Sequence, residues 1–462
     1  MRTHRHSTSS LIAVPLVGAI SCLGLTVGLA GTASGAQTSA RSATAPSATT
    51  ITYQVHPITK LALATPGATA GGFPYTPSEC VATFGLACYS PQDLRTGYDF
   101  PSTATGAGQT IVIVDAYGSP TLRSDLTVYD TEFDLPAANL NIFYPEGRPT
   151  YNPRQHHNET SWAAETSLDV EQAHGLAPAA TIDLVVAPNN SGNALNNAEA
   201  FAVDNHLGSV MSMSFGAPED LFRGNNDQLL QANAIYQQAV SQGMSVFASS
   251  GDSGATEGTA APTALFPASD PLVTSVGGTD LFLSDSGTYE SETTWNDSVA
   301  SLCPFGCAAG AFGATGGAPS ILFPQPSYQA SDGSGFTTAR TTSDVSFNAS
   351  VYTGTMIYLG FLGGANNGFY FFGGTSEGSP SWAAIAALAD QAAGHPLGEL
   401  NPLLYSIAAN STSYAADFHN IYGPGQSNAF GGPGYSATAA GYNLPTGLGS
   451  PNVANLISSL AG

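Results

Sequence analysis

The chain has 462 residues, 42% of them hydrophobic, so it is long and apolar enough to bury one large core. Only 9% of residues are charged, with 33 acids against 10 bases and a formal net charge of −23. A surface this acidic repels nucleic acids and anionic membranes, which argues against both as partners. Carboxylates take up protons near about pH 4, so acidification removes this self-repulsion and acid tolerance is expected.

The N-terminal segment is typical of an export signal. Arg2 and Arg5 precede an apolar run over about residues 11–30, and small residues follow as far as Ala36. We predict that residues 1–36 are a signal peptide, so the mature protein is secreted, extracellular and free of the membrane. A retained transmembrane anchor is the alternative, but Pro15 and several glycines interrupt the run.

Residues 37–75 are rich in Ser, Thr, Ala and Pro and have too little apolar content for a core of their own. We interpret them as a low-complexity arm or the remnant of a pro-segment. One folded domain is expected over residues 76–462.

Four cysteines remain after the signal, in two close pairs. Cys80 lies near Cys88, and Cys303 lies near Cys307. In an oxidising compartment two local disulfides are the natural interpretation. A zinc site is the alternative, but no histidine pair stands at ligand spacing from either pair.

From residue 110 onward, β-branched apolar runs alternate with helical patterns. The predicted strands are 110–114, 182–186, 210–213, 245–247 and 272–276, and the predicted helices are 161–174, 194–205 and 228–242. This order predicts an α/β fold with a central, mostly parallel sheet and helices on both faces. Ligands of such sheets bind at the carboxyl ends of the strands. The turns at Asp115, Ser214 and residues 249–254 are therefore expected to face one cleft.

Two acids on the first of these helices form a candidate pair. Glu165 and Asp169 are four residues apart, which puts both carboxylates on one helical face. A solvated acidic face is the simpler interpretation. If the pair is buried, repulsion and desolvation raise at least one pKa, and the pair can share a proton and act as a base.

Asp252 follows a predicted strand in the turn at residues 249–254. An aspartate in such a turn most often stabilises the turn itself. Aimed into the cleft and protonated, it could instead donate a hydrogen bond to an oxyanion.

Ser376 is the candidate nucleophile. The aromatic pair Phe371-Phe372 stops at two glycines, and an Ala-rich helical run begins near Ser376 and continues past Pro380. A serine at this point is often only a helix N-cap. The same position offers unpaired N–H groups, the positive end of the helix dipole and glycines that permit close approach of a substrate.

Histidine is the competing base. His174 is read as a residue at a helix C-terminus, while His156 and His157 lie in a polar loop. Either loop histidine could complete a Ser-His-Asp triad with Asp115, which ends the first predicted strand.

Three motifs in this order resemble the sedolisin family of serine-carboxyl peptidases: Glu165-x-x-x-Asp169, the turn at residues 249–254, and Gly373-Gly374-Thr375-Ser376 followed by Pro380. Residues 210–216, Arg340 with residues 344–346, and residues 446–451 support the resemblance, which spans about residues 76–460. The resemblance implies a subtilisin-like α/β fold and cleavage of proteins at acidic pH. It makes residues 76–462 a peptidase catalytic domain.

The resemblance also implies a role for each site residue. Ser376 matches the nucleophile, Glu165 the general base, and Asp169 the residue that orients Glu165 and shares its proton. Asp252 matches the acid that stabilises the oxyanion. The assignment agrees with the chemistry, since acyl transfer needs a deprotonated base beside a protonated oxyanion donor.

The chain departs from the family pattern in two places. Family members usually carry a long folded pro-domain, whereas only residues 37–75 stand between signal and domain here. The family's calcium site uses aspartates, and the matching places hold Asn420, Ile421, Gly441 and Asn443. Asparagine can bind Ca²⁺ through its amide oxygen, but the lost charges weaken such a site.

The sequence therefore predicts a secreted, monomeric serine-type endopeptidase. It would act on polypeptides at acidic pH through an acyl-enzyme on Ser376. A histidine-dependent subtilisin-like peptidase and a non-catalytic secreted binding protein on a peptidase scaffold are the alternatives.

Overall fold

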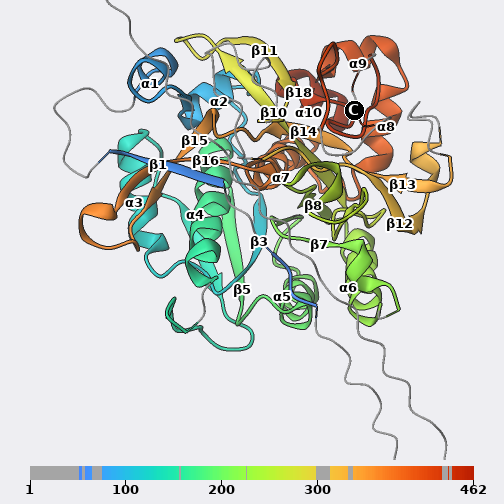
Figure 1. Cartoon of the computed structure of the whole chain (residues 1–462), viewed down its shortest axis with the longest axis horizontal. Coiled ribbons are helices and arrows are strands. Elements are labelled where there is room, and N and C mark those ends of the chain that lie inside the picture. The colour runs from blue at the N-terminus through green and yellow to red at the C-terminus, as the bar shows by residue number, and fades with distance from the viewer. Residues whose placement is uncertain are drawn as a thin grey trace, which may run out of the picture. The chain divides into compact units, whose positions relative to one another are not determined.

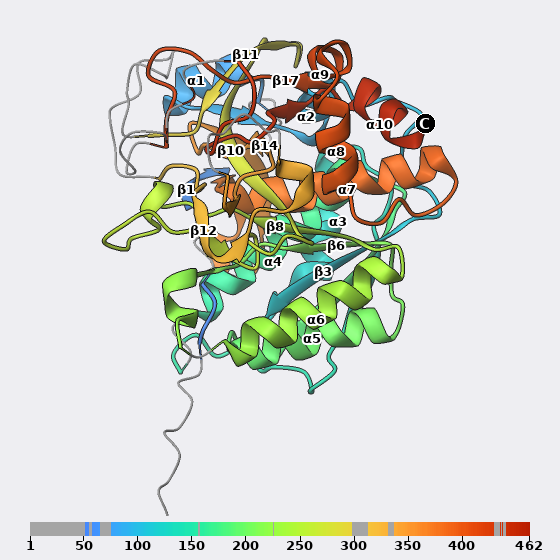
Figure 2. The same ribbon diagram turned by 90° about the vertical axis from the view of Figure 1, so that its right-hand side faces the viewer.

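The structure is a computed structural model (Figures 1 and 2). It describes residues 51–54, 58–64, 75–155, 158–224, 226–297, 313–330, 337–428, 435, 437 and 440–462. The predicted signal peptide, His156, His157, Cys303 and Cys307 lie outside these ranges.

Among the described residues, the main sheet has eight strands, in the order β11-β10-β8-β6-β3-β5-β4, with β14 paired to β10. Neighbouring strands from β10 to β4 are parallel, β14 is parallel to β10, and β11 is antiparallel. Its strands are β3 (Thr110–Ala116), β4 (Asn139–Phe143), β5 (Thr181–Ala187), β6 (Val210–Met213), β8 (Ser245–Ser249), β10 (Thr274–Leu283), β11 (Tyr289–Thr294) and β14 (Val345–Asn348). The predicted mostly parallel sheet is confirmed.

Helices cover both faces of this sheet because its strands alternate apolar side chains between the faces. Ile111 and Ile113 of β3 join one core, and Val112 and Val114 join another. The first core packs against α4 (Glu159–Leu176) and α7 (Thr375–Ala393), and the second against α5 (Gly192–Asp204) and α6 (Asp227–Ser241). Figure 2 shows α5 and α6 side by side.

A second sheet lies beside the first and was not predicted. Its order is β1 (Ile58–Ala64), β16 (Gly368–Gly373), β15 (Thr353–Leu359) and β2 (Ala87–Tyr89). The Phe371-Phe372 pair therefore belongs to this sheet and not to the central one. Since β16 runs directly into α7, the second sheet fixes the direction from which the chain reaches Ser376.

The predicted strands and helices match β3, β5, β6, β8 and β10 and α4, α5 and α6 to within a few residues, apart from β10, which runs on to Leu283. Two elements between residues 122 and 143 were missed. These are α3 (Leu122–Glu132), whose sequence is mostly polar, and the short edge strand β4.

The remaining α-helices and strands are short. They are α1 (Pro77–Phe84), α2 (Pro91–Gly97), β7 (Ala217–Pro218), β9 (Leu265–Phe266), β12 (Pro319–Pro324), β13 (Ala339–Thr341), α8 (Asn401–Ala408), α9 (Ser411–Asp417), β17 (Phe418–His419), β18 (Ser450–Pro451) and α10 (Val453–Ala461). A search of the described residues finds no helix with the length and apolar character needed to cross a membrane.

One of the two predicted disulfides lies in the described part of the chain. Cys80 of α1 and Cys88 of β2 are joined, with 5.9 Å between their Cα atoms. The bond closes a short loop that contains the second half of α1, a helix that begins with a capping box in which Thr76 and Glu79 satisfy each other's backbone N–H groups. The predicted disulfide between Cys80 and Cys88 is confirmed.

Buried acids are frequent in this core. Glu199 of α5 is fully buried in the core shared with α6, and burial raises its pKa from 4.5 to about 8. The folded state therefore holds this proton more tightly than the unfolded chain does.

We predict that the protein loses stability as pH rises through this window. The contribution of Glu199 is fully present below about pH 4.5 and is lost by about pH 8, because unfolding then releases its proton. In Glu199→Gln the free energy of unfolding should fall less over this pH range than in the wild type, by roughly 5 kcal/mol at most. Calorimetry across this pH range measures it, with the exposed Asp204→Asn on the same helix as the control. Equal pH dependence in wild type and Glu199→Gln would contradict the prediction.

Candidate active site

Ser376 lies in the first turn of α7 and is 3% exposed. One interpretation of the sequence made Ser376 the N-cap of this helix, and the structure contradicts it. Gly374 holds that position with φ of 111°, a conformation that side chains disfavour, and Ser376 follows two residues later. The serine side chain is therefore not needed to cap the helix.

Pro380 explains how the first turn of α7 is held. Proline has no N–H, so it cannot bond to the carbonyl four residues earlier, which is that of Ser376. The hydroxyl of Ser214, just beyond the end of β6, donates to this carbonyl at 3.3 Å. The same hydroxyl lies 2.8 Å from Oδ1 of Asp169, so Ser214 connects the nucleophile's backbone to the acidic pair.

Glu165 and Asp169 project from α4, which packs directly against α7. Both residues are 0% exposed, so the solvated acidic face considered from sequence is excluded. The Ser376 hydroxyl faces Glu165 and lowers the pKa of that carboxyl by hydrogen bonding, against a larger increase from burial. The contact is loose: within the described residues neither Glu165 oxygen has a hydrogen bond of ordinary geometry. Catalytic contacts are often loose before substrate binds.

A third acid joins the pair. Asp115, at the carboxyl end of β3, is fully buried. Burial raises the pKa values of Glu165 and Asp169 most, and the charge of Asp115 raises both further. Burial in turn raises the pKa of Asp115 well above 3.8. The three carboxyls cannot all ionise together, so they share protons. The sequence placed Asp115 at this edge of the sheet, but gave it a role only in the alternative histidine triad.

Asp252 approaches from the other side of Ser376. Its Oδ1 accepts hydrogen bonds from the N–H and the hydroxyl of Thr375, at 2.7 and 2.8 Å. Its Oδ2 faces Gly374, where an added Cβ would lie only 2.7 Å away. The charge of Asp252 also raises the pKa of Glu165, which places the two acids in one electrostatic environment. Ser376, Glu165, Asp169 and Asp252 are thus brought together from three distant segments, namely α7, α4 and the turn after β8.

His174 of α4 does not contact the candidate catalytic residues; its contacts lie elsewhere. His174 lies 2.9 Å from Asp130 and 3.1 Å from the carbonyl of Pro136, in the last turn of the helix, as the sequence predicted. In the part of the chain that the structure describes, the side chains that shift the pKa of Glu165 and Asp169 are carboxyls and hydroxyls, not imidazoles.

The places matching the family's calcium site are closed by amide hydrogen bonds. Asn420 accepts from the N–H of Gly441 at 2.9 Å and donates to its carbonyl at 3.0 Å. Asn443 donates to the carbonyl of Ile421 at 3.2 Å and accepts from Thr446. The two amide oxygens accept from Gly441 and Thr446, and the two carbonyls accept from the amide N–H groups. None of these four residues carries a charge, so they do not fit Ca²⁺.

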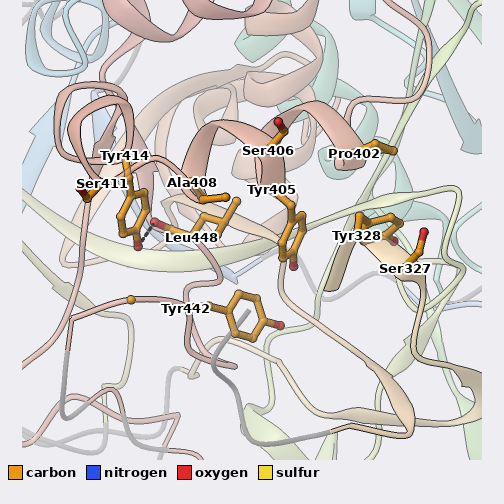
Figure 3. A pocket seen from close by; sticks show the side chains of 12 residues that line it. Ser327, Tyr328, Pro402, Tyr405, Ser406, Ala408, Ser411, Tyr414, Tyr442 and Leu448 are labelled. Carbon is orange, nitrogen blue, oxygen red and sulfur yellow. Dashed lines mark hydrogen bonds between the residues drawn. The ribbon is translucent and has the colours of Figure 1, made fainter. Parts of the chain in front are cut away.

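A cavity of about 570 Å³ lies beside this loop. Tyr328, Tyr405, Tyr414 and Tyr442 line it (Figure 3), and Tyr414 donates to the carbonyl of Leu448 at 2.9 Å. The lining does not include the four candidate site residues.

The family of the chain follows from comparison with known proteins. The profile of the subtilase family (Peptidase_S8) matches residues 139–423. The chain therefore belongs to the subtilase family.

More specific similarities lie within the serine-carboxyl group. Kumamolisin of Bacillus sp. (strain MN-32) is 33% identical over 386 residues, covering 80% of this chain and 63% of that protein. Sedolisin of Pseudomonas sp. (strain 101) is 29% identical over 377 residues, covering 80% of this chain and 60% of that protein. The chain thus spans about three fifths of the length of these relatives.

A solved structure agrees with these similarities. Pseudomonas sedolisin, a serine-carboxyl proteinase solved with two molecules of pseudo-iodotyrostatin, superposes with a TM-score of 0.69 at 27% identity. The match covers 81% of this chain and 98% of that one. The predicted resemblance to sedolisins and the subtilisin-like α/β fold are confirmed.

The closed amide loop predicts that metal removal leaves the protein unchanged. Dialysis against a chelator should shift the unfolding temperature by less than about 1 °C, because the oxygens of this loop are already hydrogen-bonded and offer a cation no charged ligand. Thermal unfolding with and without added Ca²⁺ measures this. A calcium-dependent rise of several degrees would show that the loop rearranges to bind the ion.

Proposed function

We propose that the protein is an exported serine-type endopeptidase that hydrolyses peptide bonds at acidic pH through an acyl-enzyme on Ser376. One observation carries the proposal. The Ser376 hydroxyl faces Glu165 at the start of a helix, inside a cluster of buried carboxyls. The subtilase family and the similarity to sedolisin support a serine-type peptidase.

In the proposed first half-reaction, Ser376 Oγ attacks the carbonyl carbon of the scissile bond and its proton passes to Glu165. The carbonyl oxygen becomes negative and accepts a hydrogen bond from protonated Asp252. When the tetrahedral intermediate collapses, Glu165 gives the proton to the leaving amine. The ester of Ser376 remains.

In the second half-reaction, water attacks this ester and gives a proton to Glu165. Asp252 again stabilises the oxyanion. Collapse breaks the ester bond, the proton returns to Ser376 Oγ, and the carboxylic acid product leaves. Asp169, held by Ser214, shares the proton of Glu165 and keeps its carboxyl oriented.

The proposed activity at acidic pH follows from the opposite protonation states that Asp252 and Glu165 require. Asp252 can donate to an oxyanion only while it carries a proton, so activity falls as pH rises. Glu165 must be able to accept one, so activity also falls when the carboxyl cluster is fully protonated. These opposite requirements give a bell-shaped pH profile on the acidic side of neutrality.

We expect Ser376→Ala and Glu165→Gln each to lower the digestion of denatured casein at acidic pH by at least about 10³-fold. Mass spectrometry of the products measures the loss, and circular dichroism checks that each variant is folded. Glu171→Gln is the matched control: this buried acid lies on the same helix but accepts the N–H of Tyr358 instead. Full activity in Glu165→Gln would contradict the mechanism, and activity best near neutral pH would favour a histidine base.

A further inference from the structure

The cavity of about 570 Å³ described above has tyrosine side chains for walls (Figure 3). They come from four segments: Tyr328 from a 3₁₀ turn (η4, Ser327–Gln329), Tyr405 from α8, Tyr414 from α9 and Tyr442 from the loop before β18. The volume lies within the range of about 300–1,000 Å³ that is typical of small-molecule sites. The lining contains none of the candidate catalytic residues, so the proposed peptidase chemistry gives this cavity no role.

Hydrogen bonds at the hydroxyls hold these rings in place. Three of the four hydroxyls donate to a protein oxygen and also accept from a side-chain amide. Tyr405, for example, donates to Oδ1 of Asp344 at 2.9 Å and accepts from Gln329 at 2.8 Å. The fourth, Tyr442, donates to Oγ1 of Thr341 at 2.9 Å. The walls are therefore fixed before a ligand binds, which lowers the entropic cost of binding.

Three of the rings form one continuous row. The ring centroids of Tyr328 and Tyr405 are 5.2 Å apart, with 44° between the ring planes. Those of Tyr405 and Tyr442 are 6.0 Å apart, with 39° between the planes. Because the hydroxyls of these rings are already bonded to the protein, the row offers a ligand ring carbon rather than hydrogen-bond donors.

The polar side chains of the cavity stand at its rim. Ser327, Ser406 and Ser411 line the cavity and are exposed. Within the part of the chain that the structure describes, their hydroxyls bond to no other protein group. Each can donate to a ligand and accept from it without breaking a bond inside the protein. The row of rings and the rim serines together suit a ligand with an apolar face and hydroxyl groups around its edge.

The charges near the cavity disfavour an ionic ligand. None of the described residues that line it is charged, and a chain with 33 acids against 10 bases repels anions. A cation is disfavoured too, because the guanidinium of Arg340 already lies 5.9 Å from the ring centroid of Tyr328. Asp344 is paired with Arg340 and leaves no net negative charge there. An uncharged ligand is therefore favoured.

We propose that this cavity is a carbohydrate-binding site, in which a neutral sugar ring of a polysaccharide stacks on the row of Tyr328, Tyr405 and Tyr442 and bonds through its hydroxyls to the rim serines. Binding here anchors the protein to the polysaccharide. The site goes beyond the proposed peptidase function and needs no catalysis, so its occupation can be measured in Ser376→Ala.

Titration calorimetry of the full chain carrying Ser376→Ala tests the site with cellohexaose, chitohexaose and maltohexaose. At least one of these neutral oligosaccharides should bind with a Kd below about 1 mM. Tyr442→Ala removes one ring of the row and should weaken that binding by at least about 10-fold. Tyr422→Ala is the matched control, because this tyrosine is 52% exposed and does not line the cavity, and it should leave the Kd unchanged.

Three results of this titration would overturn the proposal. The first is binding of none of the three oligosaccharides, and the second is equal weakening in Tyr442→Ala and Tyr422→Ala. The third is tighter binding of choline chloride than of any oligosaccharide, weakened in Tyr442→Ala, which would show a cation site instead.

A second variant keeps the test decisive if Tyr442→Ala does not fold. Ser406→Trp places a large side chain at an exposed rim position, so it blocks the cavity and leaves every wall residue in place. Oligosaccharide binding should fall by at least about 10-fold, while digestion of soluble casein by the same variant with Ser376 intact should be unchanged. Unchanged oligosaccharide binding in Ser406→Trp would place the sugar elsewhere and overturn the proposal.

Discussion

The burial of three carboxyls side by side is the constraint on which the rest of this structure depends. Glu165, Asp169 and Asp115 are completely removed from water between α4, β3 and α7. In the described part of the chain no cation contributes to the pKa shifts of these three groups. Because an unpaired charge is very costly to bury, the cluster must hold protons, and burial raises its pKa values so that it keeps protons at pH values where exposed carboxyls have lost them. The chemistry proposed for Ser376 and the pH range proposed for it therefore have one physical origin.

Two backbone devices keep the nucleophile against this cluster. Gly374 takes a conformation closed to most residues and leaves room for the carboxyl of Asp252. Pro380 removes one helical hydrogen bond, because it has no N–H to donate to the carbonyl of Ser376. The hydroxyl of Ser214 donates to this carbonyl instead. Ser214 also bonds to Asp169, so the position of the helix and the orientation of the acid are set by the same hydroxyl. A serine cap alone would not produce this arrangement.

Much of the fold could be predicted because buried parallel strands are continuous apolar runs, as β3, β5 and β6 are. The second sheet could not be predicted, because the pairing of β16 with β1 and β15 depends on contacts between distant segments. The pair Phe371-Phe372 would also have the same local sequence pattern in either sheet. The acidic pair was readable from its helical spacing. The part played by Ser214 was not, because it bonds to a carbonyl 162 residues away, and a lone serine after a strand carries no signal of that contact. The aromatic neighbours of Tyr53 could not be predicted either, because they come from folded loops that are distant in the sequence.

The central claim is that Ser376 forms a covalent intermediate with Glu165 as its base. The most direct measurement is rapid acid quenching of a reaction with a short peptide ester at acidic pH, followed by mass spectrometry of the digested protein. The account predicts that the acyl group is found on the peptide containing Ser376 in the wild type and is absent, on the same timescale, in Glu165→Gln. Product formation with no adduct on Ser376, or an adduct on another residue, would contradict it.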